Sequence, residues 1–165
     1  MTYEDAPPPT AALDAFLAAW AGRDPAAFTT CCAPDLHYED PFCGEGLSGP
    51  EAMGAHAGRL WRGAPDVTLA PTGPALHDRG HLCVPLVLQG RDTGGLDDHP
   101  PSRRRLVLPV VLFAQLDPPG ERVWRARAFC DRYDAALQLG RVPAPGTFGE
   151  RALSALQGFG LRPRS

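Results

Sequence analysis

The chain has 165 residues, of which 44% are hydrophobic and 21% charged, the composition of one soluble globular domain. Its net charge of −3 gives no electrostatic reason to expect binding to nucleic acid or to an anionic membrane. All 16 basic residues are arginines, which excludes a Schiff-base lysine and a P-loop. No apolar run is as long as a membrane span, and the acidic, Pro-rich N-terminus is unlike a signal peptide, so we expect a cytoplasmic location.

The first half of the chain is predicted to be mainly helical. Residues 1–9 are expected to be disordered. An apolar stripe at helical spacing predicts a helix over residues 10–22, formed by Leu13, Phe16, Leu17 and Trp20. Asp24 and Pro25 begin a second short helix that ends by Cys32, and Ser48-Gly49-Pro50-Glu51 begins a third that continues to Trp61. Between the second and third helices, residues 36–40 have the pattern of a short strand.

The second half is predicted to be mainly strands. Residues 81–89, 105–116 and 122–130 are predicted to be long strands, and a strand pair or one interrupted strand is expected near residues 67–77. Helices followed by an antiparallel meander indicate an α+β fold. We expect a cone-shaped, curved antiparallel sheet, with the three N-terminal helices enclosing a pocket.

Three further segments complete the predicted organisation. Residues 90–102 are polar and rich in Gly and Pro, which favours a mobile loop at the mouth of the pocket. A short helix is expected over residues 131–140, with Gly140 as its C-cap. The main domain is assigned to residues 10–142, and residues 143–165 form a C-terminal extension. The five cysteines show no C-x-x-C spacing and are interpreted as reduced.

The strand over residues 36–40 carries the first candidate site. Period-2 alternation places Tyr38 and Asp40 on one face, and Pro41 ends the strand. A carboxylate on an apolar face has its pKa raised towards working pH and can act as a general base. The alternative is that Asp40 ends the strand and accepts backbone hydrogen bonds from the following turn.

The order of these pieces resembles the nuclear-transport-factor-2-like superfamily, and within it the SnoaL-like polyketide cyclases and ketosteroid isomerases. The resemblance covers residues 10–142 and rests on five segments: Phe16…Trp20…Arg23-Asp24, His37-Tyr-Glu-Asp-Pro, Leu47-Ser-Gly-Pro-Glu-Ala-Met, Ala128-Phe-Cys-Asp131 and Leu137-Gln-Leu-Gly140. It implies a catalytic carboxylate at Asp40 and an acid–base carboxylate at Asp131, with no metal and no cofactor. Asp131 could instead cap the helix that follows it.

Two departures from the family limit the chemistry. Phe16 stands where the isomerases keep an oxyanion-binding Tyr, and residues 106–116 hold no acid, which argues against a true ketosteroid isomerase. The cyclases use a His on the neighbouring strand, where the only long polar side chain in the core of this chain's strand is Gln115, and Gln cannot take a proton.

The remaining candidates would bind substrate or stabilise the fold. The predicted substrate-binding residues are Phe16, Trp20, Trp61, Leu86, Gln115, Trp124 and Cys130. His37, His56 and His81 are interpreted as structural, and no grouping of His residues favours a metal site.

The leading hypothesis is a cofactor-free cyclase or isomerase of secondary metabolism that acts on an apolar, partly aromatic carbonyl substrate. Asp40 and Asp131 would transfer protons. Tyr38 would orient Asp40 or donate a hydrogen bond to a developing oxyanion, and Gln115 would assist. One alternative is a limonene-type epoxide hydrolase that uses Arg125 or Arg127. Another is a non-catalytic binding or dimerisation module. The resemblance also implies a homodimer formed through the open face of the sheet.

Overall fold

The computed structural model describes residues 10–96 and 99–156. Residues 1–9, which are expected to be disordered, lie outside the described residues. So do residues 97–98 of the long loop and residues 157–165 at the end of the C-terminal extension. Across the described ranges, no helix is long and apolar enough to cross a bilayer.

The helices of the first half are α1 (Thr10–Gly22), η1 (Pro25–Ala27), α2 (Phe28–Cys31) and α3 (Pro50–Gly63). The predicted second helix is thus a 3-10 turn followed by one short α-helical turn. It begins where the carboxylate of Asp24 accepts a hydrogen bond from the N–H of Ala26 (2.9 Å). Pro25 fits the first position because that residue needs no N–H. α3 also begins with a proline, Pro50, followed by Glu51 at the positive end of the helix dipole.

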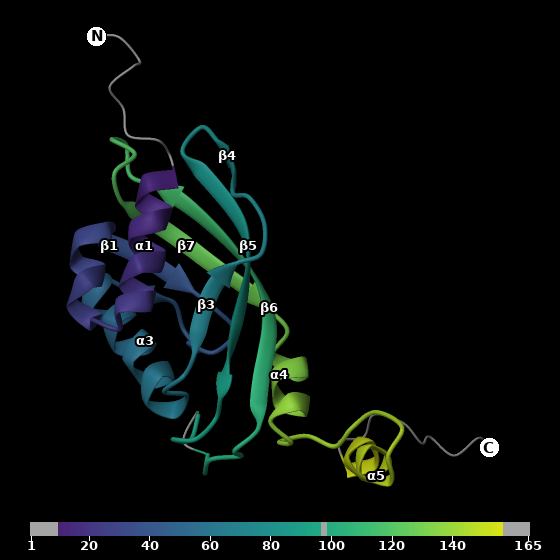
Figure 1. The fold of residues 1–165 in the computed structure, drawn as a ribbon. Helices are drawn as coiled ribbons and strands as arrows, with labels where there is room; N and C mark the ends of the chain where they lie inside the picture. Colours follow the sequence, from purple (N-terminus) through teal and green to yellow (C-terminus); the bar gives the residue numbers. More distant parts are fainter. Residues whose placement is uncertain (1–9, 97–98, 157–165) are drawn as a thin grey trace.

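Seven strands form one curved sheet in the order β2-β1-β7-β6-β5-β3, and β4 pairs with β5 outside this order. Their bounds are β1 (Cys32–Glu39), β2 (Leu47–Ser48), β3 (Thr68–Pro71), β4 (Leu76–Asp78), β5 (His81–Arg91), β6 (Arg105–Leu116) and β7 (Val123–Cys130). Neighbouring strands are antiparallel except β1 and β7, which are parallel. α1 and α3 cover one face of the sheet, which confirms the predicted α+β cone (Figure 1).

β1 begins at Cys32, earlier than the predicted strand start at Leu36. Its pairing with β7 shifts register between Cys32 and His37, so the strand passes through an irregular stretch that includes Pro34. A proline is tolerated there because it lacks the N–H that a regular ladder would need. The correction adds residues 32–35 to the strand that leads into Asp40.

The long strands separate an inner face from an outer face. In β6 the inner residues are buried and are Leu106, Leu108, Val110, Leu112 and Ala114. The alternating outer residues Val107, Val111 and Phe113 are each about 40% exposed, at 39%, 41% and 43%. The sheet therefore has one face packed under the helices and one apolar face that no other described element covers.

Two apolar clusters fill the inner side. The larger one holds a group of aromatic side chains, namely Phe16, Trp20, Phe28, Tyr38 and Trp61. The smaller one packs Leu106 and Leu108 of β6 against α4 (Arg132–Gln138), and Phe42 packs against it. Asp40 is therefore held between the two clusters, because Tyr38 lies in the first and Phe42 borders the second.

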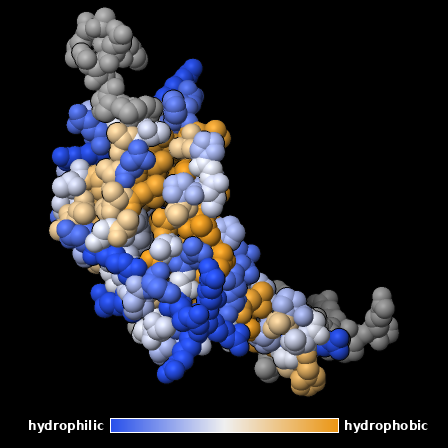
Figure 2. Space-filling view, in the orientation of Figure 1, coloured by the Kyte–Doolittle hydropathy of each residue, from blue (hydrophilic) through white to orange (hydrophobic). Residues whose placement is uncertain are grey.

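The predicted loop over residues 90–102 is anchored where the structure describes it. Asp92 is 1% exposed, and its carboxylate accepts hydrogen bonds from the N–H groups of Gly95 (3.1 Å) and Ser102 (2.9 Å). The guanidinium of Arg141, just beyond α4, lies 3.8 Å from the same carboxylate. A buried carboxylate with backbone donors fixes the conformation of a turn. Figure 2 shows this end of the molecule as strongly hydrophilic.

The last described helix, α5 (Phe148–Leu156), stands away from the domain (Figure 1). It lies within the predicted C-terminal extension, and Phe148 at its start is largely exposed. The expected helix over residues 131–140 is α4, and Gly140 follows it with a positive φ of 72°, as a C-cap requires.

Candidate functional site

The candidate site is built on Asp40, which directly follows β1. Pro41 prevents the strand from continuing, and the chain turns back on the carboxylate. Oδ1 of Asp40 accepts hydrogen bonds from the N–H groups of Phe42 (2.7 Å) and Cys43 (2.8 Å). The predicted turn contacts of Asp40 are therefore present, but they use only one of its two oxygens.

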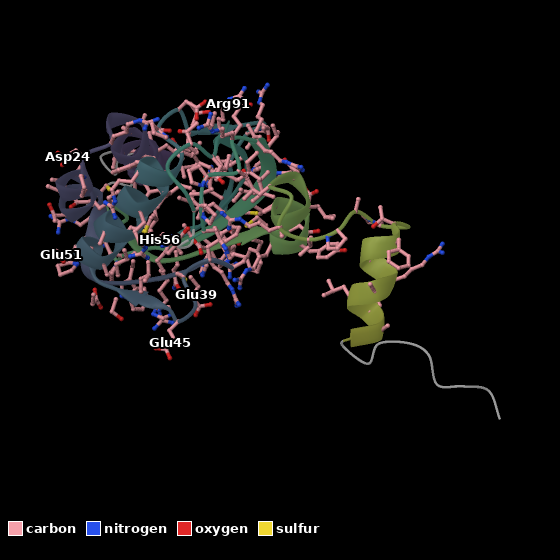
Figure 3. The ribbon with its side chains drawn as sticks, turned by 90° about the horizontal axis from the view of Figure 1, so that it is seen from below. Asp24, Glu39, Glu45, Glu51, His56 and Arg91 are labelled. Atoms are coloured by element: carbon pink, nitrogen blue, oxygen red, sulfur yellow. The ribbon has the colours of Figure 1, made fainter. Side chains whose placement is uncertain are left out.

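The other oxygen of Asp40 faces two side chains that can transfer protons. Oδ2 lies 2.7 Å from Nε2 of His56 on α3 and accepts a hydrogen bond from the hydroxyl of Tyr38 (3.0 Å). The side chains of His56 and Asp40 are only 10% and 9% exposed. His56 lies within the body of the domain, whereas Glu45 and Glu51 lie at its rim (Figure 3). The strand parity that placed Tyr38 beside Asp40 is confirmed.

The ionisation of this group differs from the sequence prediction. Burial alone would raise the pKa of Asp40, but the hydrogen bond from His56, the charge of that ring when protonated, and the N–H of Phe42 together lower it below its ordinary value. The predicted raised pKa of Asp40 is therefore wrong, because donors surround the carboxylate. Burial, followed by the charge of Asp40, raises the pKa of Tyr38 well above its ordinary value, so its hydroxyl stays protonated.

The lowered pKa of Asp40 predicts how stability depends on pH. A carboxylate whose pKa is lower in the folded state stabilises the protein above its unfolded pKa of about 3.9, and this contribution is lost as the pH falls through the folded value. We expect the free energy of unfolding to fall on acidification below about pH 4 less steeply in Asp40→Asn than in the wild type. Urea unfolding at a series of pH values measures this. Asp24→Asn, at an exposed helix cap, controls for the loss of any one carboxylate, and equal slopes in all three proteins would contradict the prediction.

His56 was predicted to be structural, and its contact with Asp40 corrects that interpretation. Its polar ring lies on the buried face of α3 with Met53 and Ala57, a position where a histidine needs a hydrogen-bonding partner. That polar residue on an apolar helical stripe is the signal in the sequence. The partner could not be identified because it lies on a different element.

Arg59 is a site residue that the sequence analysis missed. It follows His56 by three residues, so both side chains project from the same side of α3. A guanidinium nitrogen of Arg59 lies 3.0 Å from Nδ1 of His56. The site is thus a chain of four side chains, Tyr38, Asp40, His56 and Arg59.

Asp131 occupies a different environment from Asp40. It is exposed, and Oδ1 accepts hydrogen bonds from the N–H groups of Tyr133 (2.8 Å) and Asp134 (3.0 Å), which makes it the N-cap of α4. The alternative interpretation as a helix cap is therefore confirmed. The predicted acid–base role loses its support, since both contacts are those of a cap.

Two predicted substrate-binding residues lie away from the inner face. Gln115 follows Phe113 in the alternation of β6 and belongs to the outer face. Trp124 lies where the pairing of β6 with β7 shifts register, so it departs from the alternation of β7. Its indole N–H donates to Asp35 (2.9 Å), and the guanidinium of Arg125 lies 4.4 Å from its ring centroid. The bulge removes Trp124 from the regular alternation of β7, which a pattern of single residues does not record.

The other predicted substrate-binding residues lie on the inner side. Phe16, Trp61 and Leu86 are buried in the larger apolar cluster. Trp20 also lines a hollow of about 160 Å3 with residues in or next to α1, β3 and β5, namely Ala21, Arg23, Val67, Thr68, Leu69 and Leu88. Cys130, at the end of β7, is partly buried, which raises its pKa to about 11, and the nearby charge of Asp40 adds to this.

The described residues hold no group of three or more His, Cys, Asp or Glu side chains placed to bind a metal ion. All five cysteines are free thiols, including the buried neighbours Cys31 and Cys32. The contacts among Asp40, His56, Tyr38 and Arg59 place groups capable of proton transfer and hydrogen bonding together.

A curved sheet with helices across one face and polar groups at the end of its first strand defines the class of cone-shaped α+β domains. Residues 13–126 match the family of the SnoaL-like domain, so the chain belongs to the SnoaL-like family. Among curated proteins, none matches this chain in sequence.

Solved structures share the fold at low sequence identity. A Catenulispora acidiphila protein with a ketosteroid-isomerase-like fold, in complex with trimethylamine, has 22% identity and a TM-score of 0.67, over 89% of this chain and 99% of that one. A proposed SnoaL-like polyketide cyclase from a Jannaschia species has 17% identity and a TM-score of 0.69, over 87% and 99%. IdmH of Streptomyces antibioticus, a proposed polyketide cyclase, has 15% identity and a TM-score of 0.67, over 80% and 98%.

Proposed function

We propose that this protein is a cofactor-free enzyme of the cyclase or isomerase type that moves a proton next to the carbonyl group of an apolar substrate. The observation that carries this proposal is the 2.7 Å contact between the carboxylate of Asp40 and the ring of His56, with the hydroxyl of Tyr38 on the same oxygen. Three groups capable of proton transfer or hydrogen bonding to a developing anion thus meet in a largely buried place. A carboxylate that served only to end β1 would need none of these side chains.

The substrate class follows from the surroundings of the site. The inner side of the sheet is lined with apolar and aromatic side chains, which suits a hydrophobic, partly aromatic carbonyl compound. Leu88 lines the hollow beside Trp20 and also packs against both apolar clusters, so the hollow adjoins the inner side. Its volume of about 160 Å3 is below the roughly 300 Å3 at which ligand pockets begin, so a polycyclic substrate requires side chains to move. The polyketide cyclase names of the neighbouring structures favour a role in secondary metabolism.

The first experiment measures exchange of carbon-bound hydrogen with D2O in 2-tetralone, an aromatic bicyclic ketone, by proton NMR. We expect the wild type to accelerate exchange beside the carbonyl over buffer alone. Asp40→Asn should lower this rate at least about 100-fold, because general acid–base groups contribute that much or more.

The matched control is Asp24→Asn, which removes a carboxylate from the cap of η1 and keeps a capping side chain. This variant should retain the wild-type rate. If the wild type gives no acceleration, or if Asp40→Asn retains the full rate, the proposed catalysis is rejected.

A non-catalytic binding module is the second candidate, and one observation favours it. Asp40 already accepts four hydrogen bonds, so its lone pairs are occupied in the free protein. Quenching of tryptophan fluorescence by 2-tetralone without exchange would support this candidate. The epoxide hydrolase alternative is less well supported, because the arginines it would use, Arg125 and Arg127, are both exposed on the outer face of the sheet. Arg127 also forms an ion pair with Glu39.

We also propose that the protein is a homodimer formed through the outer face of the sheet. Val107, Val111, Phe113 and Phe129 lie together there on β6 and β7, each 39% to 50% exposed. Several large apolar side chains exposed on one face of a sheet are typical of a surface that binds another protein. A second copy fits this face because the same flat surface on both partners is complementary to itself under two-fold symmetry.

A further inference from the structure

The hydrogen bonds of Asp40 raise a question about which atom accepts the proton. Oδ1 is occupied by the N–H groups of Phe42 and Cys43, and Oδ2 by Tyr38 and His56. A carboxylate has about four lone-pair sites, so all of them are in use. Asp40 therefore has to lose an existing hydrogen bond before it can take a proton from a substrate.

The contact between Arg59 and His56 determines where the proton of the imidazole lies. A guanidinium can only donate hydrogen bonds, so Nδ1 of His56, 3.0 Å away, has to accept and carries no proton. A neutral imidazole then has its proton on Nε2, which donates it to Asp40 at 2.7 Å. His56 is therefore a neutral donor to Asp40 and not the cationic half of an ion pair.

Arg59 can leave this position. Its side chain is exposed, and among the described residues no carboxylate forms an ion pair with it. An exposed contact of this kind is worth little in free energy, so a bound molecule can displace it. Displacement would free the lone pair of Nδ1 while Asp40 still holds Nε2–H.

We propose that Nδ1 of His56 is the proton acceptor of this site, and that Arg59 covers it in the free protein and then binds the oxygen of the anion formed. This inference rests on the proposed function and specifies its atoms. Asp40 is the positioning residue, because its hydrogen bond fixes the orientation of the ring and stabilises the imidazolium that forms.

The chemical step balances without any co-reactant. The C–H bond next to the substrate carbonyl breaks, and its proton goes to Nδ1. The electron pair of that bond forms a C=C double bond, and the carbonyl oxygen becomes an enolate oxygen paired with the guanidinium of Arg59. Return of the proton to another carbon completes an isomerisation. Attack of the enolate carbon on a second carbonyl of the same molecule, followed by proton transfer to the new alkoxide, completes a cyclisation.

The first test does not depend on activity. Nitrogen-15 NMR of histidine-labelled, ligand-free protein at neutral pH, with His56→Gln to assign the signals, reports which ring nitrogen carries a proton. We expect a protonated Nε2 and an unprotonated Nδ1. A protonated Nδ1 would overturn the proposal, whatever the exchange assay shows.

The second test uses the 2-tetralone exchange assay. His56→Gln should lose at least about 100-fold, like Asp40→Asn. Arg59→Met should also lose about 100-fold, as for removal of a donor to an oxyanion, and Arg59→Lys should recover part of the rate. Arg62→Met, an exposed arginine on the same helix, is the matched control and should keep the wild-type rate.

The outcomes separate this inference from the proposed function. If Asp40→Asn abolishes exchange but His56→Gln and Arg59→Met do not, Asp40 is itself the base and the inference fails while the function stands. If the wild type does not accelerate exchange, the proposed function fails, and the role given to Nδ1 fails with it. Because His56→Gln could unfold a buried site, its near-ultraviolet circular dichroism has to match that of the wild type, and Arg59→Met, at an exposed position, gives the independent answer.

Discussion

Trp61→Ala is expected to destabilise the protein by about 3–5 kcal/mol, the cost of removing a buried aromatic side chain. The ring of Trp61 packs edge-on against Trp20 at a centroid distance of 5.7 Å and stacks on Phe28 at 6.4 Å. Its removal leaves a cavity that three helices border, since Trp20 lies on α1, Phe28 on α2 and Trp61 on α3. Domains of this size are stable by about 5–15 kcal/mol, so the variant should be close to unfolding. Urea denaturation followed by circular dichroism measures the change.

Trp124→Ala is the matched control for that prediction. Trp124 lies at the bulge between β6 and β7, and its contacts are the hydrogen bond to Asp35 and the guanidinium of Arg125. Partly exposed contacts of these kinds contribute about 1 kcal/mol each at most. A loss at Trp124 as large as that at Trp61 would show that the assignment of inner and outer tryptophans is wrong.

The fold could be predicted because most of its elements keep a regular period. The helical stripe of Phe16 and Trp20 predicts the buried face of α1, and the structure confirms it. The sequence of β6 is apolar on both faces, so it indicates a strand without showing which face is buried. The predictions fail where the regular spacing of buried residues along an element is interrupted. The bulge at Trp124 and the irregular start of β1 depend on pairing with distant strands, which no local pattern records.

The site was predictable only within single elements. Asp40 and Tyr38 are two residues apart on one strand, so parity alone brought them together. Asp131 had the pattern of a helix cap and is one. The contact of Asp40 with His56 joins two elements, and its geometry depends on how α3 crosses the sheet. Arg59 could be recognised only once His56 was known to be a site residue.

Phe129→Glu is expected to convert the proposed dimer into monomers. Phe129 is 50% exposed on β7 and lies beside Val111 of β6 in the pairing of these strands. Two-fold symmetry brings both copies of a central residue into one interface, so the substitution buries two carboxylates in an apolar contact. Burying a charge in an apolar contact costs several kcal/mol, and although Arg127 adjoins Phe129, the two carboxylates repel each other across the interface. Sedimentation equilibrium over a range of protein concentrations measures the change in mass.

Phe148→Glu is the control for that experiment, since Phe148 is 85% exposed on α5, the helix that stands away from the sheet. This variant removes an exposed phenylalanine and adds the same charge, so a general effect of charge on self-association would appear in both proteins. We expect the dimer to persist in Phe148→Glu and to be lost in Phe129→Glu. A monomeric wild type would reject the dimer outright. Loss of the dimer in Phe148→Glu alone would place the interface on α5, and the outer face of the sheet would then need another occupant.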